Sequence, residues 1–354
     1  MRVLFVSCDP LDGAVTRYRC THLAEALKSA GHTADVATIY DPVIRLEHDI
    51  VVLHRICANR EGQALADAVR KSGATLIYGA DDLVFEEGLH LAMLRQADGV
   101  LVSTNALAEF ASEAGAKDVV VARNVADARQ IPMLALSPDL QAKFLNLGGK
   151  VRLFYPSGTP THDADFAVIG ETLSALLGTY SELRLVLMGP LTIPEALRSR
   201  QSQILTLPLM DWDNFTAVMR WTNIVLAPLA QTRFNQGKSE LKWQEAAILE
   251  TATVASNWGG FAESVRDGED GFLASTLDDW SQKLSELIER QELRDTIRCA
   301  AFARLQRMRE ERNATLFEQF GLWADLGPIH LTTVSNPRGF AKGMVKRTLR
   351  RLKA

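Results

Sequence analysis

Continuous apolar runs alternate with helical patterns along the first third of the chain. Runs such as RVLFVSC and DIVVLHR are typical of parallel strands buried on both faces. The segments between them, for example RYRCTHLAEALKSAGH, repeat apolar residues at helical spacing. Because strand–helix–strand crossovers place consecutive strands in parallel, this alternation predicts an open parallel sheet covered by helices.

The alternation stops and then starts again, which predicts two domains. Prolines and glycines punctuate residues 128–150, and strand-like runs resume with VRLFYPSG, LRLVLMGP and NIVLAPL. We predict a first domain over residues 1–127, an interdomain connection over 128–150, and a second domain over 151–325 with closing C-terminal helices. The predicted fold class is α/β, with two Rossmann-like doubly wound domains facing a central cleft. A length of 354 residues suits two such domains.

The end of the chain, residues 326–354, has a different composition. From Arg338 to Ala354 it holds seven basic residues and no acidic residue, with apolar residues between them. Basic amphipathic segments bind anionic membrane surfaces. We favour that role over the alternatives, a solvated tail or a nucleic-acid contact.

Composition and charge narrow the class of protein. The chain is 47% hydrophobic and 23% charged, which is ordinary globular usage, and its net charge of −4 argues against a surface built for nucleic acid. Its four scattered cysteines contain no CxxC pair and predict reduced thiols. No signal peptide is recognisable, and no apolar run approaches the ~20 residues of a membrane span. We therefore expect a cytoplasmic protein that binds no nucleic acid.

A polar loop followed by a helix, in the stretch FNQGKSELKWQEAA, is the strongest candidate for a ligand site. Lys238 and Ser239 fall where a helix is predicted to begin, and Glu245 lies two turns inside it. Unpaired N–H groups at a helix start suit a phosphate, and a carboxylate further along suits a ribose. The alternatives are a serine cap with a solvated lysine, and a glutamate that faces solvent.

The loop after the strand VRLFYP is a second candidate. Ser157, Gly158 and Thr159 offer hydroxyls, backbone amides and a glycine conformation that suit a diphosphate. The same loop could instead cap the following helix and need no ligand. His162 is a candidate catalytic residue, although a lone histidine is more often a packing or loop residue.

Charged residues also follow two predicted strands of the first domain. Asp81 and Asp82 end the strand ATLIYG, where Asp82 could act as a general base or merely cap a loop. Adjacent residues of an extended chain point in opposite directions, so we expect at most one of the two to face the site. Arg17 and Arg19 open the first helix and could bind an anionic acceptor or phosphate, or be solvated.

Several ordered segments resemble a known family. YPSGTPTHDADF, FNQGKSELKWQEAA and TVASNWGGFAESVRDGEDGFL, preceded by YGADDLVF and GVLVSTNALAEF, are similar to glycosyltransferases of the GT-B fold. The resemblance is to glycosyl transferases group 1-like enzymes of the bacterial surface-polysaccharide type. It covers roughly residues 1 to 320.

This resemblance implies a nucleotide-sugar donor in the second domain and an acceptor in the first. It implies that Glu245 binds the donor ribose, while Lys238 and Ser239 face its phosphates. Many retaining relatives carry a second glutamate eight positions earlier, where this chain has Gly237. Retaining and inverting stereochemistry therefore both remain open.

The sequence predicts an enzyme that moves a hexosyl or related sugar from a nucleoside-diphosphate sugar to a surface-glycan or lipid-linked acceptor. No D-x-D-like motif stands in a donor-loop context, so we expect no metal and no other cofactor. The tail would place the protein on the inner face of the membrane. The alternatives are an inactive GT-B scaffold at the membrane, favoured by Gly237, and a nucleotide-sugar epimerase.

Overall fold

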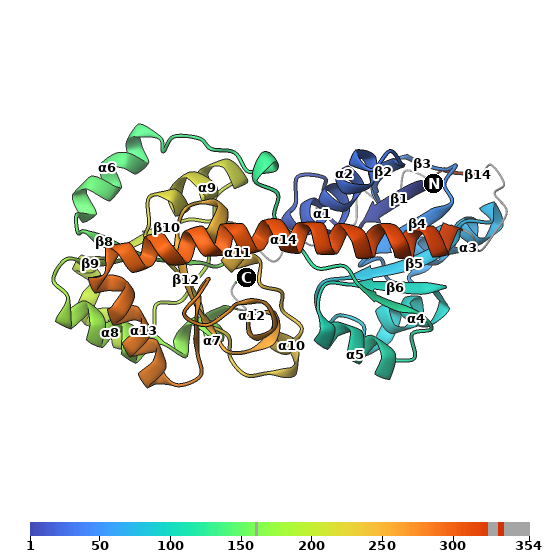
Figure 1. Ribbon diagram of the computed structural model, residues 1–354. Coiled ribbons are helices and arrows are strands. Elements are labelled where there is room, and N and C mark those ends of the chain that lie inside the picture. Colours follow the sequence, from blue (N-terminus) through green and yellow to red (C-terminus); the bar gives the residue numbers. More distant parts are fainter. Residues whose placement is uncertain (160–161, 325–331, 336–354) are drawn as a thin grey trace. The chain divides into compact units, whose positions relative to one another are not determined.

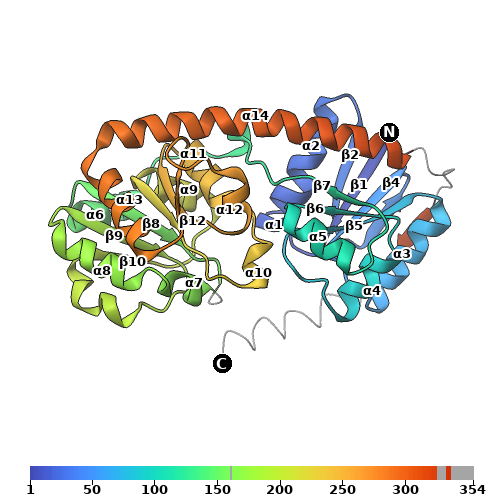
Figure 2. The same ribbon diagram turned by 60° about the horizontal axis from the view of Figure 1, so that its bottom comes forward.

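The chain forms two compact units, each built on its own parallel sheet. The computed structural model describes residues 1–159, 162–324 and 332–335. The first unit contains residues 1–124 and those from Glu310 onward, and the second contains Val125–Arg309. Each holds a six-stranded sheet with helices on both of its faces (Figures 1 and 2). The predicted α/β class with two Rossmann-like domains is confirmed.

The sheet of the first unit has the strand order β2-β1-β4-β5-β6-β7, and all of its neighbours are parallel. From β1 the chain first adds a strand on one side and then crosses to the other, so β1 and β4 flank a topological switch point. The strands are β1 (Arg2–Ser7), β2 (Thr33–Thr38), β4 (Ile50–His54), β5 (Thr75–Ala80), β6 (Gly99–Val102) and β7 (Val119–Val121).

Helices cover the two faces of this sheet. The helices α3 (Arg60–Ser72), α4 (Gly88–Gln96) and α5 (Asn105–Glu113) bury Leu65, Leu94 and Leu107 in one core. The other face carries α1 (Ala14–Thr16), the π-helical turn η1 (Arg17–Thr21) and α2 (His22–Ser29). A π-turn is rare and often marks a functional segment, which draws attention to the predicted Arg17 and Arg19.

The second unit has the strand order β10-β9-β8-β11-β12-β13, so two strands, β9 and β10, lie on one side of its first strand, where the first unit has only β2. Its switch point therefore lies between β8 and β11. The strands are β8 (Val151–Pro156), β9 (Leu183–Met188), β10 (Ile204–Leu207), β11 (Ile224–Ala227), β12 (Ala252–Ser256) and β13 (Phe272–Ala274). The helices are α6 (Pro138–Leu147), α7 (Asp163–Ala167), α8 (Gly170–Thr179), α9 (Trp212–Arg220), α10 (Arg233–Gln236), α11 (Leu241–Ile248), α12 (Gly259–Ser264) and α13 (Leu277–Glu289), with 3-10 turns η2 (Ala128–Gln130) and η4 (Glu195–Gln203).

The last helix, α14 (Gln291–Ala324), differs from the predicted domain plan. Its residues through Arg309 belong to the second unit, but those from Glu310 belong to the first. Leu316, Phe320 and Trp323 are buried in the core of the first unit, where Thr75 Oγ1 donates a hydrogen bond to the Trp323 carbonyl at 2.8 Å. The end of the helix joins the first unit because its apolar stripe is buried there. The predicted connection, 128–150, holds η2 and α6 and lies in the second unit.

A small second sheet involves the start of the predicted tail. The strand β14 (Thr332–Ser335) pairs antiparallel with β3 (Val43–Leu46), with Val334 opposite Ile44. The basic segment from Arg338 onward lies outside the described residues, so its membrane role stays a prediction. Within residues 1–159, 162–324 and 332–335, no helix is long and apolar enough to cross a membrane.

Candidate functional site

The switch point of the second unit gathers the predicted donor-binding residues. Ser157, Gly158 and Thr159 directly follow β8, whereas Lys238 and Ser239 lie between β11 and the helix α11. Because β8 and β11 are neighbours in the sheet, the loops after their carboxyl ends flank one crevice. The structure thus brings together two segments that are about 80 residues apart in the sequence.

The loop after β8 is held by hydrogen bonds to its own backbone. The buried Ser157 donates from Oγ to the Thr159 carbonyl at 2.8 Å and to the Pro190 carbonyl at 3.4 Å. We expected Gly158 to supply an unusual backbone conformation, but its φ is not left-handed and a Cβ there would meet no described atom within 4 Å. The glycine that the fold requires is Gly189, with φ +96°, where a Cβ would lie 1.8 Å from the Ser157 carbonyl oxygen.

Asp165 connects the two loops, and sequence reasoning missed it. Its Oδ1 accepts hydrogen bonds from the Ala230 backbone N–H at 2.9 Å and from Asn235 Nδ2 at 2.6 Å. Its Oδ2 lies 3.1 Å from His162 Nδ1. Burial opposes ionisation of Asp165, but these hydrogen bonds prevail and lower its pKa. The candidate His162 is therefore oriented by a buried carboxylate.

The helix α11 begins later than the sequence predicted. It starts at Leu241 after the short helix α10, so Lys238 and Ser239 lie in the turn before it. The reason is a contact distant in the sequence: the Lys238 carbonyl accepts a hydrogen bond from the Gly260 N–H at 2.8 Å. Glu245 consequently lies about one turn inside the helix rather than two. The Lys238 Nζ sits 4.6 Å from the centre of the Phe234 ring.

Glu245 is held on the buried side of α11. It is 8% exposed, so the alternative of a solvent-facing residue is wrong. The preceding residues fix the helix: Trp243 Nε1 donates to the Asp270 carbonyl at 2.6 Å, and Gln244 Oε1 accepts from the Ala126 N–H at 2.8 Å. A carboxylate on a helix this firmly held needs no large rearrangement to meet a ligand.

Lys242 is a further cation that sequence reasoning missed. Its Nζ lies 4.6 Å from the centre of the Tyr155 ring, so the side chain reaches from α11 toward the end of β8. Burial lowers the pKa of Lys242 to about 8, with Lys238 adding to the effect while Asp165 and Glu245 oppose it. Its position three residues before Glu245, on the same face of the helix, was the signal available in the sequence.

In the first unit, the switch point holds a network of opposite charges. Arg55, directly after β4, donates from Nε to Asp81 Oδ1 at 2.5 Å and from Nη2 to Asp82 Oδ2 at 2.6 Å. Asp81 Oδ1 also lies 3.2 Å from His54 Nε2. The chain bends after Ala80, so the two carboxylates do not point in opposite directions as in an extended chain, and both contact one guanidinium.

The charges of this network shift the pKa values of its members. Burial by itself would raise the pKa of Asp81, but Arg55 and His54 hold it well below the ordinary value. The two aspartates in turn raise the pKa of Arg55, although burial opposes them. Arg55 adopts a left-handed φ of +52°, which is unusual for a side chain with a Cβ. The sequence offered no signal that Arg55 would be the partner of the aspartates.

Arg17 and Arg19 have different environments. Arg17 Nη2 donates to the Asp12 carbonyl at 2.9 Å at the surface. Arg19 is only 1% exposed and donates from Nη1 to the Ala122 carbonyl at 2.5 Å and to Asn124 Oδ1 at 3.0 Å. The solvated alternative is therefore wrong for Arg19, which ties η1 to the segment after β7.

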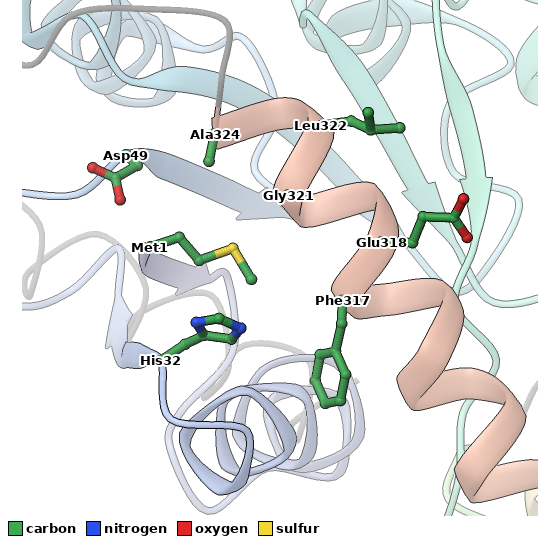
Figure 3. A pocket seen from close by; sticks show the side chains of 8 residues that line it. All are labelled: Met1, His32, Asp49, Phe317, Glu318, Gly321, Leu322 and Ala324. Atoms are coloured by element: carbon green, nitrogen blue, oxygen red, sulfur yellow. The ribbon is translucent and has the colours of Figure 1, made fainter.

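A hollow of about 720 Å³ lies elsewhere in the first unit (Figure 3). Met1 and Asp49 line it just before β1 and β4, His32 lies just before β2, and Phe317 and Leu322 line it from α14. It is therefore at the amino ends of the strands, the edge opposite to the switch point. Doubly wound sheets bind ligands at the carboxyl ends, so this hollow is separate from the candidate site.

No group of three or more histidine, cysteine, aspartate or glutamate residues capable of holding a metal occurs in the part of the chain that the structure describes. The carboxylates of Asp163 and Asp165 accept hydrogen bonds from protein N–H groups, at Thr192 and at Ala230 respectively. The expectation that the protein needs no metal stays a prediction.

Comparison with known proteins agrees with this architecture. Residues 161–290 match the family described as Glycosyl transferases group 1. No curated protein matches the sequence. A glycosyltransferase from Rickettsia africae superposes with a TM-score of 0.66 at 15% identity, covering 92% of this chain and 98% of that chain.

Two other structures are similar in the same way. HepE from Anabaena, in complex with UDP and glucose, has a TM-score of 0.63 at 15% identity, covering 91% of this chain and all of the other. Sucrose-phosphate synthase from Thermosynechococcus elongatus has a TM-score of 0.59 at 14% identity, covering 92% and 99%. Likenesses at this identity show the fold, which is GT-B. With the family match in the second unit, the predicted class of GT-B glycosyltransferase is confirmed, whereas the surface-polysaccharide type stays a prediction.

Proposed function

We propose that this glycosyltransferase binds a nucleoside-diphosphate sugar in its second unit and transfers the sugar to a glycan or lipid-linked glycan acceptor bound by the first. The observation that carries the proposal is at the β8–β11 switch point, where Lys238 in the turn before α11 accompanies Lys242 and the buried Glu245 on that helix. The lysines suit a diphosphate and the glutamate suits a ribose. HepE, which has the same fold, is described in complex with UDP and with UDP-glucose.

In this proposal, the leaving diphosphate is stabilised by fixed charges and dipoles. Lys238 lies in the turn before α11, and Lys242 lies in the first turn of that helix. The loop of Ser157–Thr159 supplies further polar groups. Preorganised donors of this kind favour the transition state because negative charge grows on the leaving oxygen as the sugar departs. Metal-independent transfer is part of the proposal, since the two ammonium groups would supply the positive charge.

Two side chains are candidates for the proton transfer that activates the acceptor. Asp82 is the candidate general base of the first unit, and its carboxylate is aimed at Arg55. His162, oriented by Asp165, is the candidate acid or base of the second unit. Gly237 leaves the sugar without the glutamate that the resemblance would supply, so either stereochemistry is compatible with the proposal.

A partner surface is also part of the proposal. The basic residues beyond Arg338 suit an anionic membrane, which is where a lipid-linked acceptor would be found. A chain truncated after Pro337 should lose binding to vesicles that contain anionic phospholipid while keeping its affinity for nucleotide. Vesicle binding that is unchanged by the truncation would remove the tail from the proposal.

The donor site is tested by calorimetry with UDP, GDP and ADP. We expect one of them to bind, and Glu245→Ala to weaken that nucleotide about 10- to 100-fold, because a charged hydrogen bond is worth ~1.5–3 kcal/mol. Glu292→Ala, an exposed glutamate of α14, is the matched control and should bind like the unaltered protein. If no nucleoside diphosphate binds to the folded protein, the proposal fails.

A second assay separates the enzyme from its alternatives. The protein is incubated with nucleotide sugars, with and without lipid-linked acceptors, and the products are identified. Transfer or slow donor hydrolysis supports a glycosyltransferase. A new free nucleotide sugar would instead assign an epimerase, and nucleotide binding without any turnover would favour the inactive scaffold.

A further inference from the structure

A cavity of about 290 Å³ in the second unit belongs to none of the groups described above. It lies beyond the carboxyl ends of β11, β12 and β13, on the side of the sheet covered by α8 and α13. Leu229, Ser256 and Ala274 line it at the ends of these strands, and Trp280 lines it from α13. Its volume is close to the lower end of the range for ligand pockets, ~300–1,000 Å³, which suits a small ligand.

The lining of this cavity contains no ionisable side chain. Its polar groups are the amides of Gln231 and Asn257 and the hydroxyls of Ser256, Ser275 and Thr276. The nearby start of α13 is already capped, because Asp279 Oδ2 accepts from the N–H groups of Ser275 and Thr276 at 2.8 and 2.9 Å. A helix start occupied by a carboxylate repels a further anion, so a phosphate or carboxylate ligand does not fit here.

The remaining chemistry suits a polyhydroxylated neutral molecule. Leu229, Leu277 and Trp280 provide apolar walls for the C–H faces of a ring, and Leu277 is 49% exposed although the residues around it are largely polar. Amides and hydroxyls at the rim can both donate and accept hydrogen bonds, as sugar hydroxyls do. Gln231 forms no side-chain hydrogen bond within the described residues and is available to a ligand.

We propose that this cavity, between Gln231, Asn257 and Leu277, is a binding site for one neutral sugar residue. It adjoins the donor loop, since the Ala230 N–H donates to Asp165 while the next residue, Gln231, lines the cavity. The inference goes beyond the proposed function, because binding here needs neither a nucleotide nor catalysis. The sugar is either a free monosaccharide or a unit of a longer glycan.

Saturation-transfer NMR with methyl glycosides of glucose, galactose and mannose, and with a neutral trisaccharide, tests this site. At least one of them should receive saturation from the full-length protein, whereas inorganic phosphate should not compete. A response to the trisaccharide alone would identify a glycan unit, and a response to the monosaccharides a free sugar. If none of the neutral sugars binds to the folded protein, the inference is overturned.

Substitutions in the cavity lining test whether the sugar detected by NMR binds in this cavity. Leu277→Trp fills the cavity and should weaken the sugar by about tenfold or more, and Gln231→Ala should weaken it less. Leu209→Trp is the matched control, because Leu209 is 60% exposed and lies outside the cavity lining. Glu245→Ala should lose nucleotide but keep the sugar, so failure of the donor site is distinguished from failure of this one. Sugar binding that survives Leu277→Trp, or that UDP abolishes by competition, would contradict the assignment.

Discussion

Each unit has a topological switch point beside its first strand, although the strand orders differ, and the charged side chains at the two switch points have different partners. In the first unit, Arg55 after β4 forms ion pairs with Asp81 and Asp82. In the second, Lys238 and Lys242 after β11 lie against aromatic rings, at 4.6 Å in each case. The corresponding loops thus hold a network of opposite charges in one unit and two ammonium groups beside aromatic rings in the other.

The difference shows how one fold can divide two tasks. A buried ion pair with good geometry orders its surroundings but adds little affinity for a ligand, because its charges are already compensated. An ammonium group on an aromatic face keeps its positive charge, which a phosphate can neutralise. This difference fits the proposed placement of the diphosphate in the second unit and of the acceptor in the first.

Breaking the ion network of the first unit should have the largest effect. Arg55→Met leaves the partly buried carboxylates of Asp81 and Asp82 without their guanidinium, which should lower the free energy of unfolding by up to ~3–5 kcal/mol. Arg198→Met is the matched control: its ion pair with Glu195 is exposed, so the change should stay within ~0.5 kcal/mol. Urea denaturation of the full chain measures both. Equal effects of the two substitutions would show that the network does not stabilise the first unit.

In the second unit, the carboxylate of Asp165 accepts hydrogen bonds from a backbone N–H and a side-chain amide and, within the described residues, pairs with no guanidinium. Asp165→Ala removes the acceptor of the Ala230 N–H and of Asn235, and should cost ~1.5–3 kcal/mol of stability in urea denaturation together with a loss of nucleotide affinity. Asp163→Ala, which removes a single exposed acceptor, is the control and should cost less. If nucleotide affinity is untouched by Asp165→Ala, the two loops are not held together by this residue.

The pH dependence of nucleotide binding should separate the two switch points further. Burial depresses the pKa of Lys242 to about 8, so Lys242 loses its charge as the pH rises above that value. Affinity for UDP should then fall by up to about fivefold between pH 8 and pH 9, since the protonated fraction of Lys242 drops from about a half to about a tenth. In Lys242→Arg the guanidinium stays charged and the decline should disappear. A decline that persists in this variant would assign it to another group.

The smallest expected effect concerns acid stability of the first unit. The folded chain holds the pKa of Asp81 below the unfolded value of about 3.9, so its stabilisation is complete above that pH and is lost as the pH falls further. Each unit of difference contributes about 1.4 kcal/mol. Asp81→Asn should therefore show a shallower loss of stability below pH 4 than the unaltered chain, measured by urea denaturation across pH. If stability falls with pH equally in the two proteins, the folded chain does not favour the ionised form of Asp81.

Much of the candidate site was visible in the sequence, but its pairings were not. Lys238, Ser239 and Glu245 could be placed beside a helix start, since loop and helix signals are local. Asp165 and Lys242 were missed because their partners, Ala230 and Tyr155, are distant in the sequence. The start of α11 was misplaced by a long-range contact with Gly260, which local propensity does not encode.

The sequence by itself determined the alternation of strands and helices, the restart that gives two units, and the GT-B resemblance. The alternation and its restart follow from the periodicity of apolar residues, which every short segment carries independently, whereas the resemblance rests on several ordered motifs. Only the tertiary structure decided that Arg55 pairs with both aspartates, that the end of α14 packs on the first sheet through Phe320 and Trp323, and that a neutral cavity adjoins the donor loop. Strand order and side-chain packing bring these residues together, and neither is a property of any one segment.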